Sequence, residues 1–258
     1  MGSLRVHVFL MCHNEQTLLP FAVRHYRCCF PDCKITVFDN LSTDDSAKLA
    51  VQHMCTVVPW DSPVPGQLDE PTLTEVKNTL WRRYVTPGTW VIVCDMDEWL
   101  MAHTQDLQQE DALGTTILLT DGWQMVGESK KADLSDISPD KVTKGYREAA
   151  YSKQICFKWD AVEPNWGHGC HEARPTGRVV CSQKTYLLKH MSTLGGEFYA
   201  ARNASRHPRM RDNRARYGWC GQYTADREMA LQRHASDLAK SANLPGDGGK
   251  VPETEVPE

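Results

Sequence analysis

The sequence lacks long apolar runs: no stretch approaches the roughly 20 apolar residues that a membrane-spanning helix needs. Residues 1–12 also lack the cationic segment, apolar core and small-residue cleavage site that form a signal peptide. There is no excess of positive charge, since 29 Lys and Arg stand against 33 Asp and Glu. A net charge of -4 gives no general reason to expect a nucleic acid or a membrane as partner. We therefore expect a soluble, cytoplasmic protein without a transmembrane segment.

The ten cysteines do not have the spacing of a structural zinc site. Cys28, Cys29 and Cys33 have no second pair at the usual distance, and Cys170 directly precedes His171. Without a secretory signal, reduced and mostly buried thiols are expected in place of disulfides. This expectation fits the cysteines that lie inside apolar runs, namely Cys12, Cys94 and Cys156.

The first half of the chain does have a regular alternation of apolar runs and helical patterns. The runs occupy 5–12, 34–39, 55–60 and 89–95, and a loop rich in Pro and Gly lies at 61–71. The fourth run, TWVIVCD, is almost wholly apolar, which is typical of a parallel strand covered on both faces. This order predicts an α/β fold with a Rossmann-like, mainly parallel central sheet flanked by helices.

The second half has a looser pattern. Further strands of mixed direction are expected at 115–127, 153–162 and 178–191, followed by a helical region over 196–242 that is broken near Pro208 and Gly218. The stretch 243–258 combines Pro, Gly and acidic residues with almost nothing to bury. That composition predicts a flexible tail or a linker to a further domain.

Polar clusters follow three of the predicted strands: CHNE at 12–15, DNLSTD at 39–44 and DMDEW at 95–99. Ligands of such sheets bind beyond the carboxyl ends of the strands, so the three clusters are expected to meet. If strand geometry continues through the third cluster, Asp95 and Asp97 point to one face. Paired carboxylates suit Mg²⁺ or Mn²⁺ with a substrate phosphate, although short acidic motifs also cap helices and turns.

HNE, DNLSTD and a D-x-D after a buried fourth strand, in this order, resemble the family-2-like glycosyltransferases of the GT-A fold. GWQMVG, GCHEARPTG and LLKHMSTLGGEFYAAR are similar to a subgroup found in bacteria and large algal viruses. The resemblance covers 6–206 and implies one GT-A domain over 1–242, with a nucleotide-binding half (1–100) and an acceptor-side half (101–242). The implied activity is metal-dependent transfer of a hexosyl or pentosyl group from a nucleotide-diphosphate sugar to a hydroxyl of a glycan or glycoprotein. A UDP-sugar is the donor that we expect first. An inverting reaction is favoured, and a retaining one stays open.

The resemblance also implies roles for individual residues. Asp39 would bind the base, and the segment around His13, Asn14 and Glu15 would line the same pocket. Asp97 would ligate Mn²⁺ or Mg²⁺, and Asp95 would lie near the ribose or a metal-bound water while remaining a candidate ligand. A further metal ligand is expected at His171, with His190 as the competitor and a purely structural histidine as the alternative.

The acceptor base has no clear motif. An inverting enzyme needs a carboxylate to deprotonate the acceptor, and the candidates are Glu128, Glu148 and Glu172, each of which also suits a surface position. Arginines crowd 202–216; the default is a solvated helix face, with Arg202 or Arg206 first in line to contact the diphosphate. Three tryptophans near the predicted site are interpreted first as packing and second as sugar-stacking rings: Trp99, Trp123 and Trp166.

Two other functions compete with a glycosyltransferase. A nucleotidyltransferase would use a similar pair of aspartates, but no Gly-rich loop bearing Lys or Arg follows the first strand. A non-catalytic module that binds a nucleotide or carbohydrate would not depend on a metal.

Overall fold

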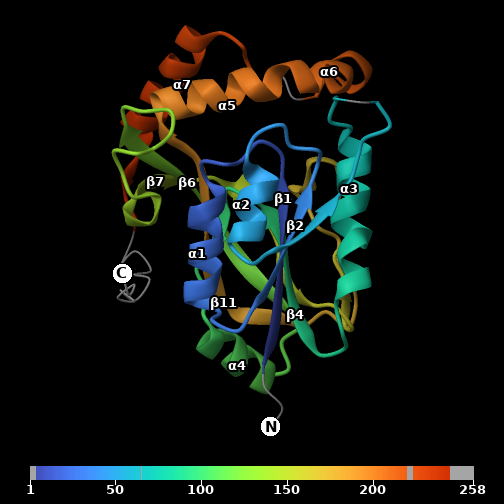
Figure 1. Ribbon diagram of the computed structural model, residues 1–258. Helices are drawn as coiled ribbons and strands as arrows, with labels where there is room; N and C mark the ends of the chain where they lie inside the picture. The colour runs from blue at the N-terminus through green and yellow to red at the C-terminus, as the bar shows by residue number, and fades with distance from the viewer. Residues whose placement is uncertain (1–3, 65, 220–222, 245–258) are drawn as a thin grey trace.

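The structure, a computed structural model, describes residues 4–64, 66–219 and 223–244. The strands expected in the first half are present as β1 (Arg5–Cys12), β2 (Lys34–Asp39), β3 (Thr56–Pro59) and β4 (Thr89–Asp95). They are parallel and lie in the order β3-β2-β1-β4. Between them run α1 (Leu19–Cys29), α2 (Ser46–Gln52), α3 (Glu70–Thr79) and the 3-10 turn η1 (Leu80–Tyr84). The predicted α/β fold, with parallel strands flanked by helices, is confirmed (Figure 1).

The second half extends the same sheet with strands of mixed direction, as predicted. It adds β5 (Glu98–Leu100), β6 (Ile117–Ser129), β7 (Lys144–Arg147), β8 (Cys156–Lys158), β11 (Cys181–Gly195) and β12 (Ala242–Asn243), and α4 (Thr104–Ala112) follows β5. β8 is antiparallel to both β4 and β6, whereas β11 runs parallel to β6 and antiparallel to β5. A separate pair is formed by β9 (Val162–Glu163) and β10 (Thr176–Gly177). Both halves of the chain thus share one sheet.

The parallel strands distribute their side chains between two apolar cores. Val8 and Leu10 lie in the core that includes Tyr26 of α1, whereas Phe9 lies in the core that includes Trp81 of η1. Successive residues of a strand point to opposite faces, so both faces of the sheet are closed by helices. The ends of the strands are therefore where a ligand can reach the sheet. The cysteines expected inside apolar runs are buried as predicted: Cys12, Cys94 and Cys156.

A helical region crosses the carboxyl ends of the parallel strands. It consists of α5 (Gly196–Arg206), η5 (His207–Met210), α6 (Arg211–Tyr217) and α7 (Arg227–Lys240). Figure 1 shows α5 and α6 above the end of the sheet at which β1 and β2 finish. The predicted breaks are present: Pro208 lies in η5, and Gly218 ends α6 with a φ of 69°. None of the helices in the described part of the chain is long and apolar enough to cross a membrane.

The described part of the chain extends slightly beyond the predicted domain boundary. The tail was expected to start at residue 243, yet Ala242 and Asn243 pair with β7 as strand β12. Leu244 is buried against the apolar core. The backbone bonds of β12 and this apolar side chain fix a stretch whose composition predicted a tail. The remaining positions, 245–258, lie outside the described residues.

Gly122 in β6 provides a test of how the sheet supports the loop beside it. A Cβ at this position would collide with the backbone of Tyr151 and Ser152. We expect Gly122→Ala to lower the free energy of unfolding by about 1–3 kcal/mol, measured by urea denaturation. The control is Gly167→Ala, because the nearest atom to a Cβ there, the carbonyl oxygen of Glu172, is 3.9 Å away. Equal stability of the two variants would contradict the predicted collision.

Candidate active site

The acidic segment after β4 forms a turn and does not continue as a strand. β4 ends at Asp95, and β5 begins at Glu98. Glu98 is 1% exposed, and its Oε2 accepts a hydrogen bond from the Asp95 amide at 2.9 Å. The Asp97 carbonyl accepts one from the Met191 amide at 2.6 Å. The strand geometry does not continue through this segment, so Asp95 and Asp97 do not share a strand face. Both side chains reach the same pocket from a turn, where Lys77 contacts Asp95 and Arg202 contacts Asp97.

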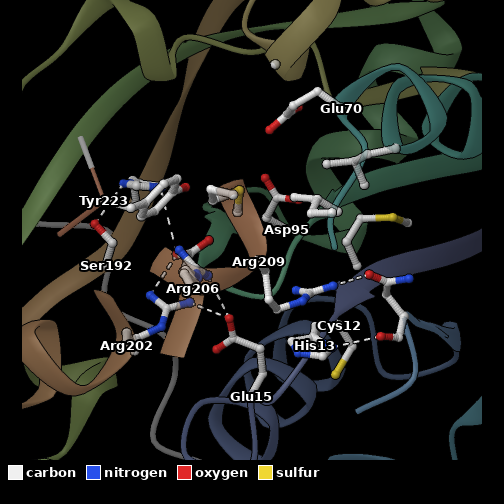
Figure 2. Close-up of a pocket in the computed structure, with 18 of the residues that line it drawn as sticks. Cys12, His13, Glu15, Glu70, Asp95, Ser192, Arg202, Arg206, Arg209 and Tyr223 are labelled. Atoms are coloured by element: carbon white, nitrogen blue, oxygen red, sulfur yellow. Dashed lines mark hydrogen bonds and ion pairs between the residues drawn. The ribbon is translucent and has the colours of Figure 1, made fainter. Parts of the chain in front are cut away.

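Asp97 belongs to a buried cluster with two arginines of α5. Arg202 donates to Asp97 Oδ2 at 2.9 Å and to Glu15 Oε1 at 2.5 Å, and Arg206 donates to the same Glu15 oxygen at 2.7 Å. Figure 2 shows both guanidinium groups directed at Glu15. Burial alone would raise the pKa of Asp97, but the guanidinium groups of Arg202 and Arg206 hold it well below the usual range. Two carboxylates from the ends of β1 and β4 are thus bound by one helix.

Asp95 belongs to a second cluster, which contains two lysines that the sequence analysis did not identify. Lys77 Nζ lies 2.7 Å from Asp95 Oδ1, and Lys153 Nζ lies 2.5 Å from Glu98 Oε1 and 3.9 Å from Asp95 Oδ2. Burial opposes the charge of Lys77, yet the Asp95 carboxylate raises its pKa well above the ordinary value. One sequence signal was available, because Lys77 follows Leu73 by four residues and so shares the apolar side of its helix.

His190 faces Asp97 with an unprotonated ring nitrogen. The amide nitrogen of Gln124 donates at 2.8 to 3.3 Å to acceptors on Met125, His190, Ser192 and Thr193. The amide oxygen of Gln124 therefore accepts from Nδ1–H of His190 at 2.8 Å. Burial lowers the pKa of His190, so the ring is neutral at pH 7 and its lone pair is on Nε2, which lies 3.9 Å from Asp97 Oδ2. Tyr151 stacks on the imidazole with 3.9 Å between ring centroids and fixes its plane.

Asp97 and His190 make a donor pair that fits a divalent cation. A carboxylate oxygen and a neutral imidazole nitrogen both ligate Mn²⁺. No group of three or more His, Cys, Asp or Glu side chains arranged to hold a metal occurs among the described residues. Two protein ligands still suffice for ions that keep waters and bind substrate phosphates. Arg202 contacts the same oxygen of Asp97, so its guanidinium has to move when a cation binds there.

His171, the metal ligand expected first, lies elsewhere in the pocket. It lines the cavity, and its Nδ1 is hydrogen-bonded to the carbonyl oxygen of Ala150 at 3.0 Å. Burial and the charge of Lys153 lower its pKa, so the ring is neutral at pH 7. Among the described contacts, the histidine that faces Asp97 is His190, which was the competitor. A metal-binding role for His171 stays a prediction.

The two polar loops expected at the ends of β1 and β2 do meet. Asn14 has a φ of 54°, and its Oδ1 accepts a hydrogen bond from the Thr43 amide at 2.7 Å. α2 begins only at Ser46. The polar residues before it connect the two loops, because Ser42 Oγ accepts from the Asn14 amide at 3.0 Å. Asp39 is directed at this loop rather than at the pocket, since its carboxylate accepts from the Ser42 amide and hydroxyl at 3.2 and 2.5 Å.

Because of these loop contacts, only some of the polar residues of the first half line the pocket. His13 and Glu15 line it together with Asn40 and Trp60, which follow β2 and β3, whereas Asn14 is not among the lining residues. The nucleotide-binding roles expected for His13, Asn14 and Glu15 stay predictions. The base-binding role of Asp39 remains a prediction.

The three candidate bases lie outside the residues that line the pocket. Glu128 is exposed, pairs with Lys144 at 2.7 Å and lines a separate cavity. Glu148 accepts from the Ala150 amide at 3.4 Å and caps a short turn. Glu172 is exposed and directly follows His171, which does line the pocket. Glu172 is therefore the candidate closest to the pocket along the chain.

The tryptophans expected near the site are mainly packing residues. Trp99 and Trp166 are buried in the two cores, and Trp123 donates from Nε1 to Asp121 Oδ2 at 3.1 Å. The packing interpretation is confirmed for the two buried rings. The tryptophan that lines the pocket is Trp60, which the sequence analysis had placed only at the end of a strand.

The arginine-rich segment is divided between the pocket and the surface. Arg202, Arg206 and Arg209 line the pocket. Arg211 and Arg216 lie within 4.0 Å of Asp212 with exposed side chains, as expected for a solvated helix face. The two arginines expected at the diphosphate do reach the pocket, but both are ion-paired with Glu15 and Asp97.

Comparison with known proteins gives structural matches only. No protein-family model matches the chain, and no curated protein does. The fold is similar to that of S. aureus TarS in complex with UDP-GlcNAc (12% identity, TM-score 0.42, 92% of this chain and 81% of that chain). It is also similar to the mannosyltransferase PcManGT from Pyrobaculum calidifontis in complex with GDP-Man and Mn²⁺ (13%, TM-score 0.44, 93% and 75%).

The shared carboxylate of Glu15 gives a direct test of the buried cluster. We expect Glu15→Gln to lower the free energy of unfolding by about 3–5 kcal/mol, because two adjacent guanidinium groups lose their common partner. Urea denaturation at neutral pH measures the loss. The matched control is Glu197→Gln, which breaks an exposed pair with Arg227 and is expected to cost less than about 1 kcal/mol. A loss at Glu15 no larger than that at Glu197 would show that the cluster does not stabilise the fold.

Proposed function

We propose that the chain is a GT-A glycosyltransferase that moves a hexosyl or pentosyl group from a nucleotide-diphosphate sugar to a hydroxyl of a glycan or glycoprotein. The donor proposed first is a UDP-sugar. The observation that carries the proposal is the Asp97–His190 pair, with 3.9 Å between Oδ2 and Nε2, in a pocket at the carboxyl ends of β1 and β4. A cation site beside basic side chains at this edge of an α/β sheet suits a sugar nucleotide.

The charges around the pocket support a diphosphate ligand. Five basic side chains line it: Lys77, Lys153, Arg202, Arg206 and Arg209. Four carboxylates line it as well: Glu15, Glu70, Asp95 and Asp97. The charges of these lining side chains thus nearly cancel. A divalent cation and a diphosphate that bind together would add charges of opposite sign, which also cancel. A bare divalent cation would leave the buried pocket with more net charge, whereas a cation that binds together with a diphosphate dianion leaves the net charge unchanged.

In the proposed reaction Asp97 and His190 hold Mn²⁺ or Mg²⁺, which supplies positive charge against the departing diphosphate when bound. Gln124 keeps the His190 tautomer that leaves Nε2 unprotonated. Glu98 holds the turn that presents Asp97 by accepting from the Asp95 amide. Asp95 stays the candidate contact to the ribose, since its side chain is 35% exposed while that of Asp97 is 3% exposed.

For the acceptor step we propose an inverting reaction with Glu172 as base. Glu172 follows His171 of the pocket wall, and its exposed carboxylate can approach an acceptor that enters from solvent. The carboxylate would take the proton of the acceptor hydroxyl as the new glycosidic bond forms.

The nucleotide-sugar and metal parts of the proposal are tested together. We expect one nucleotide sugar of a UDP and GDP panel to raise the melting temperature of the wild type in the presence of Mn²⁺, with slow hydrolysis to the nucleoside diphosphate. Asp97→Ala and His190→Ala should weaken Mn²⁺ binding, measured by electron paramagnetic resonance, because each removes one of two protein ligands. The control is Asp133→Asn, far from the pocket lining. Full Mn²⁺ affinity in both ligand variants would count against this metal site.

The base assignment is tested by turnover with the acceptor present. Glu172→Gln should lower kcat by about 10²–10⁴-fold with unchanged donor affinity, because the acceptor proton loses its carboxylate. Glu128→Gln serves as the comparison and should leave kcat unchanged, since Glu128 lies at a separate cavity. A normal rate for Glu172→Gln would remove it as the base, and a product with retained configuration would exclude the inverting step.

A further inference from the structure

Arg209 differs from the other basic residues of the pocket in having no carboxylate partner. Lys77, Lys153, Arg202 and Arg206 each lie within 4.0 Å of an Asp or Glu oxygen. Among the described residues, no such ion pair is formed by Arg209. Its guanidinium donates to Asn40 Oδ1, which is neutral, and its buried Nε has no hydrogen-bond partner in the described part of the chain. Arg209 therefore brings a positive charge that these neighbours do not offset.

The position of Arg209 is fixed by the loop beneath it. Asn40 is 4% exposed, and its Nδ2 donates to the Trp60 carbonyl at 3.1 Å, so its Oδ1 is turned toward Arg209. His13 donates from Nδ1 to the Asn40 carbonyl at 2.7 Å and holds the same residue from the β1 side. In Figure 2 the Arg209 side chain extends across the pocket toward the side of His13. The guanidinium is thus preorganised at the meeting point of the loops after β1, β2 and β3.

An uncompensated guanidinium in a half-buried pocket is costly unless an anion binds it. Burial and the nearby charge of Arg206 lower the pKa of Arg209 to about 10, so the group is still protonated at pH 7. A guanidinium pairs with phosphate oxygens through two parallel N–H groups, which gives geometric selectivity as well as charge. Nη2 of Arg209 contacts Asn40, and no hydrogen bond of Nη1 occurs among the described residues, so the guanidinium keeps donors for a phosphate oxygen.

We propose that Arg209 binds the diphosphate of the nucleotide donor, the role that the sequence assigned to Arg202 or Arg206. Those two arginines serve Glu15 and Asp97 instead, and Arg209 is the pocket cation whose charge is available to a ligand. That the ligand is a nucleotide donor rests on the proposed function. That the ligand is a phosphate-bearing anion follows from the contacts of Arg209 alone.

The test compares three probes by isothermal titration: inorganic pyrophosphate, UDP and uridine. Arg209→Gln should weaken pyrophosphate and UDP about 10- to 100-fold, because charged hydrogen bonds to phosphate are lost. Uridine, which carries no phosphate, should bind the variant and the wild type equally. Arg211→Gln is the matched control, because Arg211 is exposed on the same segment and should change nothing. Arg209→Lys keeps the positive charge but loses the paired N–H groups of the guanidinium. Its affinity for pyrophosphate and UDP should lie between those of the wild type and Arg209→Gln, and it replaces Arg209→Gln in the test if that variant does not fold.

Different outcomes separate the inference from the proposed function. Unchanged pyrophosphate and UDP affinity in Arg209→Gln would overturn the inference, and so would equal losses for UDP and uridine. If pyrophosphate binding depends on Arg209 while no nucleoside diphosphate binds, the inference stands and the nucleotide-sugar proposal fails. If the wild type binds neither pyrophosphate nor UDP, the inference and the UDP-sugar donor are both wrong.

Discussion

The interaction on which this structure depends is the contact of one guanidinium group with two buried carboxylates. Arg202 of α5 donates to Glu15 after β1 and to Asp97 after β4, and Arg206 adds a second bond to Glu15. Buried charges are stable only when their partners are present, because desolvation of an unpaired ion costs several kcal/mol. The cluster therefore joins the helical region near the C-terminus to the ends of the parallel strands and completes the pocket between them.

A ligand that binds in this pocket replaces existing ion pairs of the carboxylates; it does not fill an apolar cavity. Asp97 is bound by Arg202, and Asp95 by Lys77, so a cation or a hydroxyl that approaches either carboxylate replaces an existing contact. The groups that remain available are Nε2 of His190 and the guanidinium of Arg209. In the proposed donor site, His190 would ligate the metal and Arg209 would bind a phosphate.

The sequence predicted the framework of the site better than its contacts. Arg202 and Arg206 line the pocket, although a solvated helix face was the default expectation for their segment. The parallel strands and the meeting of the HNE and DNLSTD loops followed from local patterns. Such patterns extend over a few residues. The partners of Asp95 and Asp97 come from 18 to 109 positions away, as Lys77, Lys153, Arg202 and Arg206 show, so only the packing of α3, α5 and the 150–153 loop reveals them. Glu98 was visible as a third acid, but its bond to the Asp95 amide depends on the turn.

The most direct measurement is a crystal structure of the protein with UDP and Mn²⁺, with anomalous scattering collected for manganese. We expect an anomalous peak in contact with Asp97 and His190, Arg202 displaced from Asp97, and the diphosphate oxygens beside Arg209. A nucleotide in this pocket with manganese bound elsewhere would contradict the metal site. Manganese and nucleotide both bound outside the pocket would contradict the proposed donor site.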